Sequence, residues 1–102
     1  MSDSKKILEL IFEAVGELNE RMPEEEWLEK SKDTPLTGES AKLDSLKLVS
    51  LIVATEQKVQ EELNAIITIA SERALAQKKN PFRTVETLAD YILMLVKENA
   101  KA

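Results

Sequence analysis

The chain has 102 residues, of which 43% are hydrophobic and 32% charged, and its formal net charge is −5. This length suits a single domain, so we expect residues 1–102 to fold around one core. The chain contains neither cysteine nor histidine, which excludes a disulfide scaffold and the usual zinc sites, and its acidic balance disfavours nucleic acid as a partner.

The amino terminus reads MSDSKKILEL and lacks the apolar stretch and small-residue cleavage site of a signal peptide. No apolar run approaches the length that a membrane-spanning helix requires. We therefore expect no membrane span and a cytoplasmic location, which the lack of cysteine also suits.

The first predicted helix covers residues 4–20. Its apolar residues recur at helical spacing, as Ile7, Leu10, Ala14 and Leu18 show. Pro23 and the glutamates that follow it favour a short helical turn that carries Trp27 and Leu28, because a helix start tolerates proline and negative charge. The polar segment 31–40 predicts a loop in which Leu36 turns inward.

A second helix of about 18 residues is predicted to begin after Asp44, which is a favourable N-cap residue. Its apolar positions are Leu48, Val49, Leu51, Ile52, Val59 and Leu63. The run NAIITIA at 64–70 is rich in β-branched residues, so we expect the helix to end there.

Ser71 predicts the cap of a short third helix over 72–79, which Asn80 and Pro81 end. Thr84 predicts the cap of the last helix. Its inward face is formed by Val85, Leu88, Ala89, Ile92, Leu93 and Val96. The sequence therefore predicts an all-α fold, a small up-and-down four-helix bundle with three long helices and one short helix.

Ser45 stands at the start of the second predicted helix, in the sequence LDSLKLVSLIV. A serine nucleophile needs a base, most often histidine, and this chain has none. Lys42 and Lys47 are the nearest candidate bases, but both lie in a charged stretch that gives no reason for a lowered pKa. We therefore predict that the protein is not an enzyme.

The same position is suited to an attached anion, because the first turn of a helix carries unpaired N–H groups and the positive end of the macrodipole. A phosphodiester on Ser45 would place its charge there. A prosthetic group ending in a thiol would supply the sulfur that a chain without cysteine lacks.

The sequence LDSLKLVSLIVATEQKVQEELNAIITI resembles the central part of the acyl carrier protein family, whose members carry 4′-phosphopantetheine on the serine of an Asp-Ser-Leu motif. FRTVETLADYI at 82–92 resembles the family's entry into its last helix. The resemblance covers residues 4–96, nearly the whole chain. It implies a carrier that is a phosphoprotein of fatty acid biosynthesis or related lipid metabolism, and the departures described below suggest a specialised, non-housekeeping member.

The resemblance also implies roles for individual residues. Ser45 would carry 4′-phosphopantetheine, and Asp44 would cap the helix and present the serine to a phosphopantetheinyl transferase. Leu46, Val49 and Glu56 would contact partners. These partners would be acyl ligases, synthases or acyltransferases with basic docking surfaces, and the carrier itself would be a monomer.

The chain departs from the family pattern at several positions. Lys42 stands where the motif usually has glycine, and Lys47 and Ser50 occupy positions that are often acidic. An aminoacyl, peptidyl or D-alanyl carrier and an unmodified helical interaction module therefore stay open as alternatives. We expect five apolar residues after the second helix to belong either to the core or to the lining of an acyl pocket. They are Ile66, Ile67, Ile69, Leu75 and Phe82.

Overall fold

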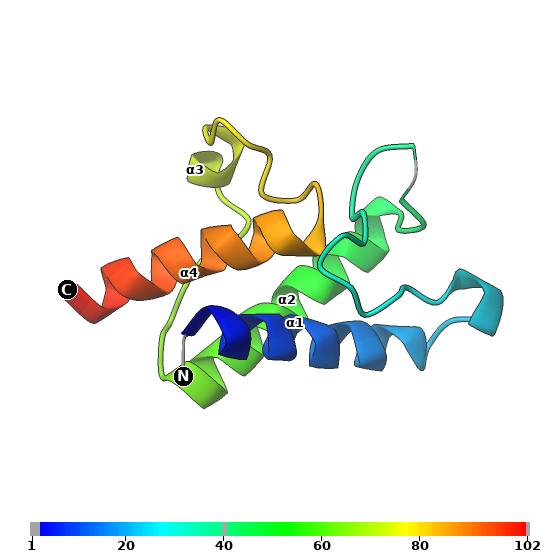
Figure 1. The fold of residues 1–102 in the computed structure, drawn as a ribbon, viewed down its shortest axis with the longest axis horizontal. Coiled ribbons are helices and arrows are strands. Elements are labelled where there is room, and N and C mark those ends of the chain that lie inside the picture. The colour runs from blue at the N-terminus through cyan, green and yellow to red at the C-terminus, as the bar shows by residue number, and fades with distance from the viewer. Residues whose placement is uncertain (1–2, 40, 102) are drawn as a thin grey trace.

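The computed structural model describes residues 3–39 and 41–101, with side chains as far as Asn99. Its elements, in chain order, are the helices α1 (Asp3–Asn19), η1 (Glu24–Glu26, a 3₁₀ turn), α2 (Ser45–Leu63), α3 (Glu72–Leu75) and α4 (Val85–Lys101) (Figure 1). The predicted small all-α bundle, with three long helices and one short helix, is confirmed. The turn expected to carry Trp27 and Leu28 instead ends at Glu26, because Trp27 has an extended backbone.

Helix α1 is the central element, because it packs against both α2 and α4. Figure 1 shows that α1 runs in the direction opposite to α2 and α4. The long connection from 64 to 84, which carries α3, returns the chain so that α4 runs the same way as α2. The three long helices share one apolar core, to which α1 contributes Ile7, Leu10, Ile11, Ala14, Val15 and Leu18.

The predicted caps are present. The carboxylate of Asp44 accepts a hydrogen bond from the backbone N–H of Lys47, 2.8 Å away. Thr84 and Thr87 cap α4 reciprocally, since each hydroxyl accepts from the other residue's N–H, at 3.2 and 3.0 Å. Such bonds satisfy N–H groups that the first helical turn leaves unpaired, so the residues expected to start α2 and α4 do start them.

Helix α3 is shorter than predicted, because it ends at Leu75 and not at residue 79. Ser71 caps it as expected, through its side-chain oxygen and the Ala74 N–H. The N–H of Ala76 then bonds to the carbonyls of Glu72 and Arg73, which tightens and closes the last turn. Residues 76–79 have no buried side chain to hold a further turn against the core.

The 20–44 segment joins α1 to α2. It is hydrogen-bonded to α1 and to the chain just before α4. At α1, the buried Asn19 side chain donates to the Leu28 carbonyl at 3.1 Å and accepts from the Leu28 N–H at 2.9 Å. Two residues before α4 begins, the carbonyl of Arg83 accepts a hydrogen bond from the Leu36 N–H at 2.9 Å. Leu36 is buried in the core, as predicted.

Candidate functional site

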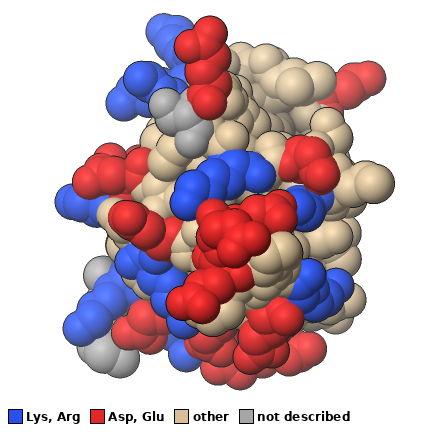
Figure 2. Space-filling model, turned by 90° about the vertical axis from the view of Figure 1, so that its right-hand side faces the viewer, with Lys and Arg blue, Asp and Glu red and all other residues tan. Residues whose placement is uncertain are grey.

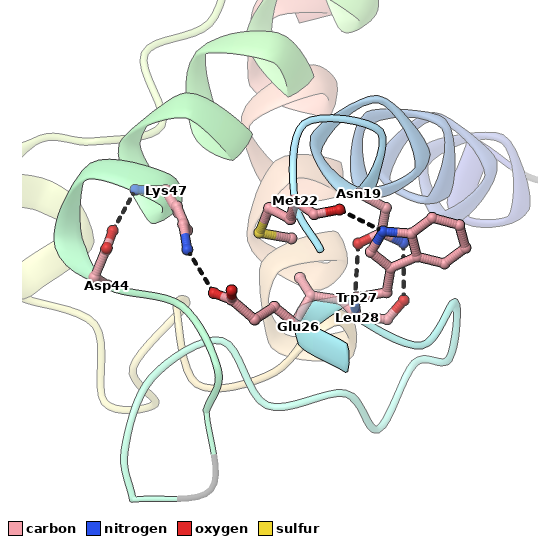
Figure 3. A network of polar contacts seen from close by, with 7 residues as sticks. All are labelled: Asn19, Met22, Glu26, Trp27, Leu28, Asp44 and Lys47. Carbon is pink, nitrogen blue, oxygen red and sulfur yellow. Dashed lines mark hydrogen bonds and ion pairs between the residues drawn. The ribbon is translucent and has the colours of Figure 1, made fainter. Parts of the chain in front are cut away.

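Ser45 is the first residue of α2, and its side chain is exposed. Figure 3 shows the neighbouring Asp44 carboxylate turned toward the N–H of Lys47. Asp44 has an extended backbone, with φ −88° and ψ 178°, which is the usual conformation of an N-cap residue. The chain therefore turns into the helix at Ser45 and leaves the serine side chain outside the core.

The helix start gives the surroundings of Ser45 a partial positive charge, because the first N–H groups of a helix have no intrahelical partner. Asp44 uses one of them, that of Lys47. The N–H groups of Ser45 and Leu46 precede it in the same turn. An anion bonded to the serine oxygen would lie next to these donors.

Lys47 is not placed to act as a base for Ser45. Its ammonium donates to a carboxylate oxygen of Glu26 at 3.0 Å, so the side chain points toward η1 (Figure 3). This hydrogen bond, together with the attraction of the Glu26 and Asp44 charges, raises the pKa of Lys47 above its ordinary value of 10.5, against the opposing effect of desolvation. A general base needs the opposite shift.

Lys42, the other candidate base, also faces the 20–44 segment. Its ammonium lies 3.5 Å from the backbone carbonyl of Trp27. The indole N–H of Trp27 in turn donates to the Met22 carbonyl at 2.9 Å, so the tryptophan is bonded to the chain just after α1 while remaining 44% exposed. Lys47 and Lys42 therefore connect Glu26 of η1 and the following Trp27 to the region where α2 begins.

Charges of both signs lie around this end of the molecule. Figure 2 shows acidic and basic side chains interspersed on the face that carries the 20–44 segment, with acidic ones at its centre. Exposed residues of this segment include Glu20, Arg21, Glu24, Glu25, Glu29, Lys30, Lys32 and Lys42. A mixed surface of this kind exerts less long-range attraction on a charged partner than a surface of one sign.

The residues after Ser45 present apolar side chains to the outside. Leu46 is 81% exposed and Val49 is 56% exposed, and Val53 continues the row with 45% exposure. Leu46 and Val49 had been singled out from the sequence, whereas Val53 had not. The signal for Val53 is its spacing, because residues 46, 49 and 53 share the helix side opposite the buried Leu51 and Val59.

The side chain of Glu56 is hydrogen-bonded within the chain. Its carboxylate accepts a hydrogen bond from the backbone N–H of Ile69 at 2.7 Å, and its side chain is half-buried. The contact holds the segment after α2 against the helix, 13 residues along the chain. The geometry therefore supports a structural role for Glu56 more directly than contact with a partner.

The candidate acyl-pocket residues do not share one surface. Ile69 is fully buried, whereas Ile66 is 73% and Leu75 is 81% exposed. Ile66 and Ile67 line a cavity of about 370 Å³ beside α3 and α4, together with Tyr91 and Leu95, but Ser45 does not line it. These five residues therefore do not line one common cavity.

No family model, curated protein or solved structure matches this chain. In the described part of the chain, no helix has both the length and the apolar character that crossing a membrane requires.

Proposed function

We propose that this protein is an acyl carrier. It holds an acyl group as a thioester on 4′-phosphopantetheine attached to Ser45, and it presents this group to enzymes of lipid or secondary-metabolite biosynthesis. The observation that carries the proposal is the exposed serine in the first turn of a helix capped by Asp44, followed directly by the exposed Leu46. Asp44, Ser45 and Leu46 also form the Asp-Ser-Leu motif of the resemblance to the acyl carrier protein family.

The chemistry of such a carrier divides between this chain and a separate transferase. The oxygen of Ser45 forms a bond to the phosphorus of phosphopantetheine and loses its proton, while the donor that held the phosphopantetheine leaves. The transferase supplies the base, so a chain without histidine is no obstacle. The thiol at the far end of the attached group then bears the acyl group as a thioester.

Each neighbour of Ser45 has a task in this proposal. Asp44 fixes the start of α2, so the serine oxygen stands at a defined place outside the core. The phosphodiester charge then lies near the N–H groups of the first helical turn, which favour an anion. Leu46 and Val49 offer apolar surface to the transferase and to the enzymes that use the acyl group.

The experiment is co-expression with a broad-specificity phosphopantetheinyl transferase, followed by the intact mass of the purified chain. We expect the wild type to gain the mass of one phosphopantetheine and Ser45→Ala to gain none. Ser50→Ala is the matched control, because this half-buried serine lies in the same helix and its replacement leaves Ser45 in place. An unmodified wild type would instead favour a helical interaction module.

The mass of the loaded protein also identifies the cargo. A fatty or hydroxy-fatty acyl group on the thiol supports an acyl carrier. An amino-acid thioester would instead indicate an aminoacyl, peptidyl or D-alanyl carrier, an alternative that Lys47 and Ser50 keep open because they lower the acidity of α2.

A further inference from the structure

Among the described residues, the hydroxyl of Tyr91 is the one buried side-chain polar atom without a hydrogen-bond partner. The residue as a whole is only 5% exposed. Buried hydroxyls of folded proteins are nearly always paired, so this exception calls for a physical explanation. A phenol hydroxyl both donates and accepts hydrogen bonds, so it can bind a polar atom of either kind.

Tyr91 lines two cavities beside α4. Figure 1 shows that α3 and the segment after it lie on the side of α4 away from α1. The smaller cavity is the one of about 370 Å³ that Ile66 and Ile67 also line. The larger, of about 570 Å³, lies between the segment 76–81 and α4. Sites for small organic molecules have volumes of about 300–1,000 Å³, so size alone does not decide between the two cavities.

The larger cavity combines an apolar wall with positive charge. Its apolar residues are Ala76, Pro81 and Met94. Lys78 and Lys79 also line it and are exposed. Among the described residues, neither of these ammonium groups has an ion-pair partner. Both lysines are therefore available to a ligand.

The balance of charge distinguishes the two cavities. Asp90 is the single carboxylate among the described residues that line the larger one, so two lysines and one aspartate leave a local charge of +1. In the smaller one, the guanidinium of Arg73 donates to the carboxylate of Glu98 at 2.6 Å, so this cation is already paired. The larger cavity therefore attracts an anion, although the chain as a whole carries −5.

The segment 76–79 covers the hydroxyl of Tyr91 only loosely. None of its side chains is buried. Its hydrogen bonds run to the neighbouring α3, as the Gln77 side-chain amide does when it donates to the Arg73 carbonyl at 3.0 Å. A segment that is held so locally can move outward at low cost in free energy, and this movement gives a ligand access to the hydroxyl.

We propose that the cavity between the segment 76–81 and α4 binds an amphipathic organic anion. The acidic group of this ligand, a carboxylate, sulfonate or phosphate, pairs with Lys78 and Lys79. Its apolar body lies against the apolar wall, and one of its polar atoms bonds to the hydroxyl of Tyr91. A ligand of this kind uses every unpaired group that the cavity offers to an anion.

The ligand is a free molecule and is distinct from any group attached to Ser45. None of the described residues of α2 lines the cavity, whereas Ser45 begins that helix. The site therefore goes beyond the proposed function and does not depend on it.

The experiment titrates two anions into the purified Ser45→Ala chain, which cannot carry an attached group at this position. Anilinonaphthalene sulfonate has an aromatic body and octanesulfonate has an aliphatic one, and NMR of the backbone amides follows both. We expect at least one of them to bind saturably, with the largest shifts in the ranges 76–81 and 87–94. Largest shifts in any other part of the chain, or no saturable binding of either anion, would overturn the proposal.

A double variant tests the two lysines. Lys78→Gln/Lys79→Gln should raise the Kd of the bound anion by about tenfold or more, because it removes the hydrogen bonds to a charged group. Lys5→Gln/Lys97→Gln is the matched control, since it removes the same charge from exposed positions that do not line the cavity. We expect the control to raise Kd by less than about threefold. Equal effects of the two double variants would assign the binding to long-range attraction and would contradict a built site.

Tyr91→Phe tests the hydroxyl. We expect this variant to raise Kd by about threefold to tenfold and to leave the pattern of amide shifts in place, because one hydrogen bond to the ligand is lost. Met94→Leu is its control, since it preserves the volume of the apolar wall and should change Kd by less than about twofold. If Tyr91→Phe bound the anion as tightly as the control does, the hydroxyl would have no part in the site.

The proposed function and this site fail separately. A wild type that gains no phosphopantetheine would end the proposed function, and the binding of an anion to Ser45→Ala would be unaffected. A modified wild type whose Ser45→Ala variant binds neither anion would keep the proposed function and remove the site.

Discussion

The ammonium of Lys47 lies 3.0 Å from a carboxylate oxygen of Glu26, and this ion pair joins η1 to the first turn of α2 (Figure 3). The two residues are 21 positions apart in the chain. The pair therefore places the acidic turn η1 beside the helix start that carries Ser45.

We predict that Glu26→Gln lowers the pKa of Lys47 toward its ordinary value of 10.5, because the hydrogen bond to Glu26 is the largest cause of the raised pKa. NMR titration of the Lys47 side chain measures this directly. Glu25→Gln, which removes an exposed neighbouring carboxylate of η1, should leave the Lys47 titration close to that of the wild type.

The ion pair between Lys47 and Glu26 also predicts how the free energy of unfolding changes with pH. A lysine whose pKa is raised in the folded state contributes stability that is fully present below the unfolded pKa, and this contribution is lost as pH rises through the folded pKa. The decline in the free energy of unfolding above pH 10.5 should therefore be shallower for Glu26→Gln than for the wild type. The pair is partly exposed to solvent, so the difference between the two proteins should be small. An identical decline in both proteins would refute the coupling between Glu26 and Lys47.

Asp44→Ala should lower the free energy of unfolding by about 1 kcal/mol, because it removes the side-chain acceptor of the Lys47 N–H at the start of α2. Asp44→Asn keeps an acceptor at this position and should lie within about 0.5 kcal/mol of the wild type. Urea unfolding checks both values. If the two variants lost the same stability, the charge of Asp44 and not its capping bond would be responsible.

Asn19→Ala should lower the free energy of unfolding by roughly 2 to 4 kcal/mol. The substitution leaves the N–H and the carbonyl of Leu28 without their buried partner, and each such group costs about 1–3 kcal/mol. Asn99→Ala is the control, because Asn99 is exposed and its side chain donates to the Ile66 carbonyl. A loss below about 1 kcal/mol for Asn19→Ala would mean that water replaces both bonds.

Asn64 ends α2 in the left-handed conformation, with φ 53° and ψ 37°. Glycine adopts this conformation without strain, so Asn64→Gly should preserve stability or raise it by up to about 1 kcal/mol. Asn64→Val should lower it by about 1–2 kcal/mol, because a β-branched residue is strained there. Thermal unfolding distinguishes the two, and equal midpoints would contradict the assigned backbone conformation.

Tyr91 is 5% exposed, and its hydroxyl has no hydrogen-bond partner among the described residues. Tyr91→Phe keeps the ring and removes the unsatisfied oxygen, so we expect the free energy of unfolding to rise by about 1 kcal/mol. Chemical denaturation provides the measurement. A decrease of similar size would show that the hydroxyl is bonded in solution.

The helix starts could be predicted from the sequence because a cap acts within three residues of its partner. Asp44, Ser71 and Thr84 each bond to an N–H three positions later, so side-chain type and spacing suffice. The end of α3 was predicted too late, because it depends on where burial stops. The two bonds between Asn19 and Leu28 join the end of α1 to a loop and leave no local pattern.

The candidate site divides in the same way. The positions of Ser45, Asp44 and Leu46 follow from the first turn of one helix. The spacing of Val53 places it on the same side of α2 as Leu46 and Val49. Which side of the helix is covered depends on how α1 packs against α2, and sequence spacing alone does not say this. Glu56 received a partner-facing role from the resemblance, whereas its bond to Ile69 depends on the path of the chain after the helix.

The outward position of Ser45 has a consequence for how a loaded carrier is recognised. A group attached at that oxygen lies outside the packing of α1, α2 and α4. The phosphodiester stabilises the helix start by about 0.3–1 kcal/mol whichever acyl group it carries, so forms with different acyl groups should melt at nearly the same temperature. The folding equilibrium is then indifferent to the cargo. An enzyme that distinguishes one acyl group from another must therefore contact the attached group itself, because the packing of the helices does not depend on it.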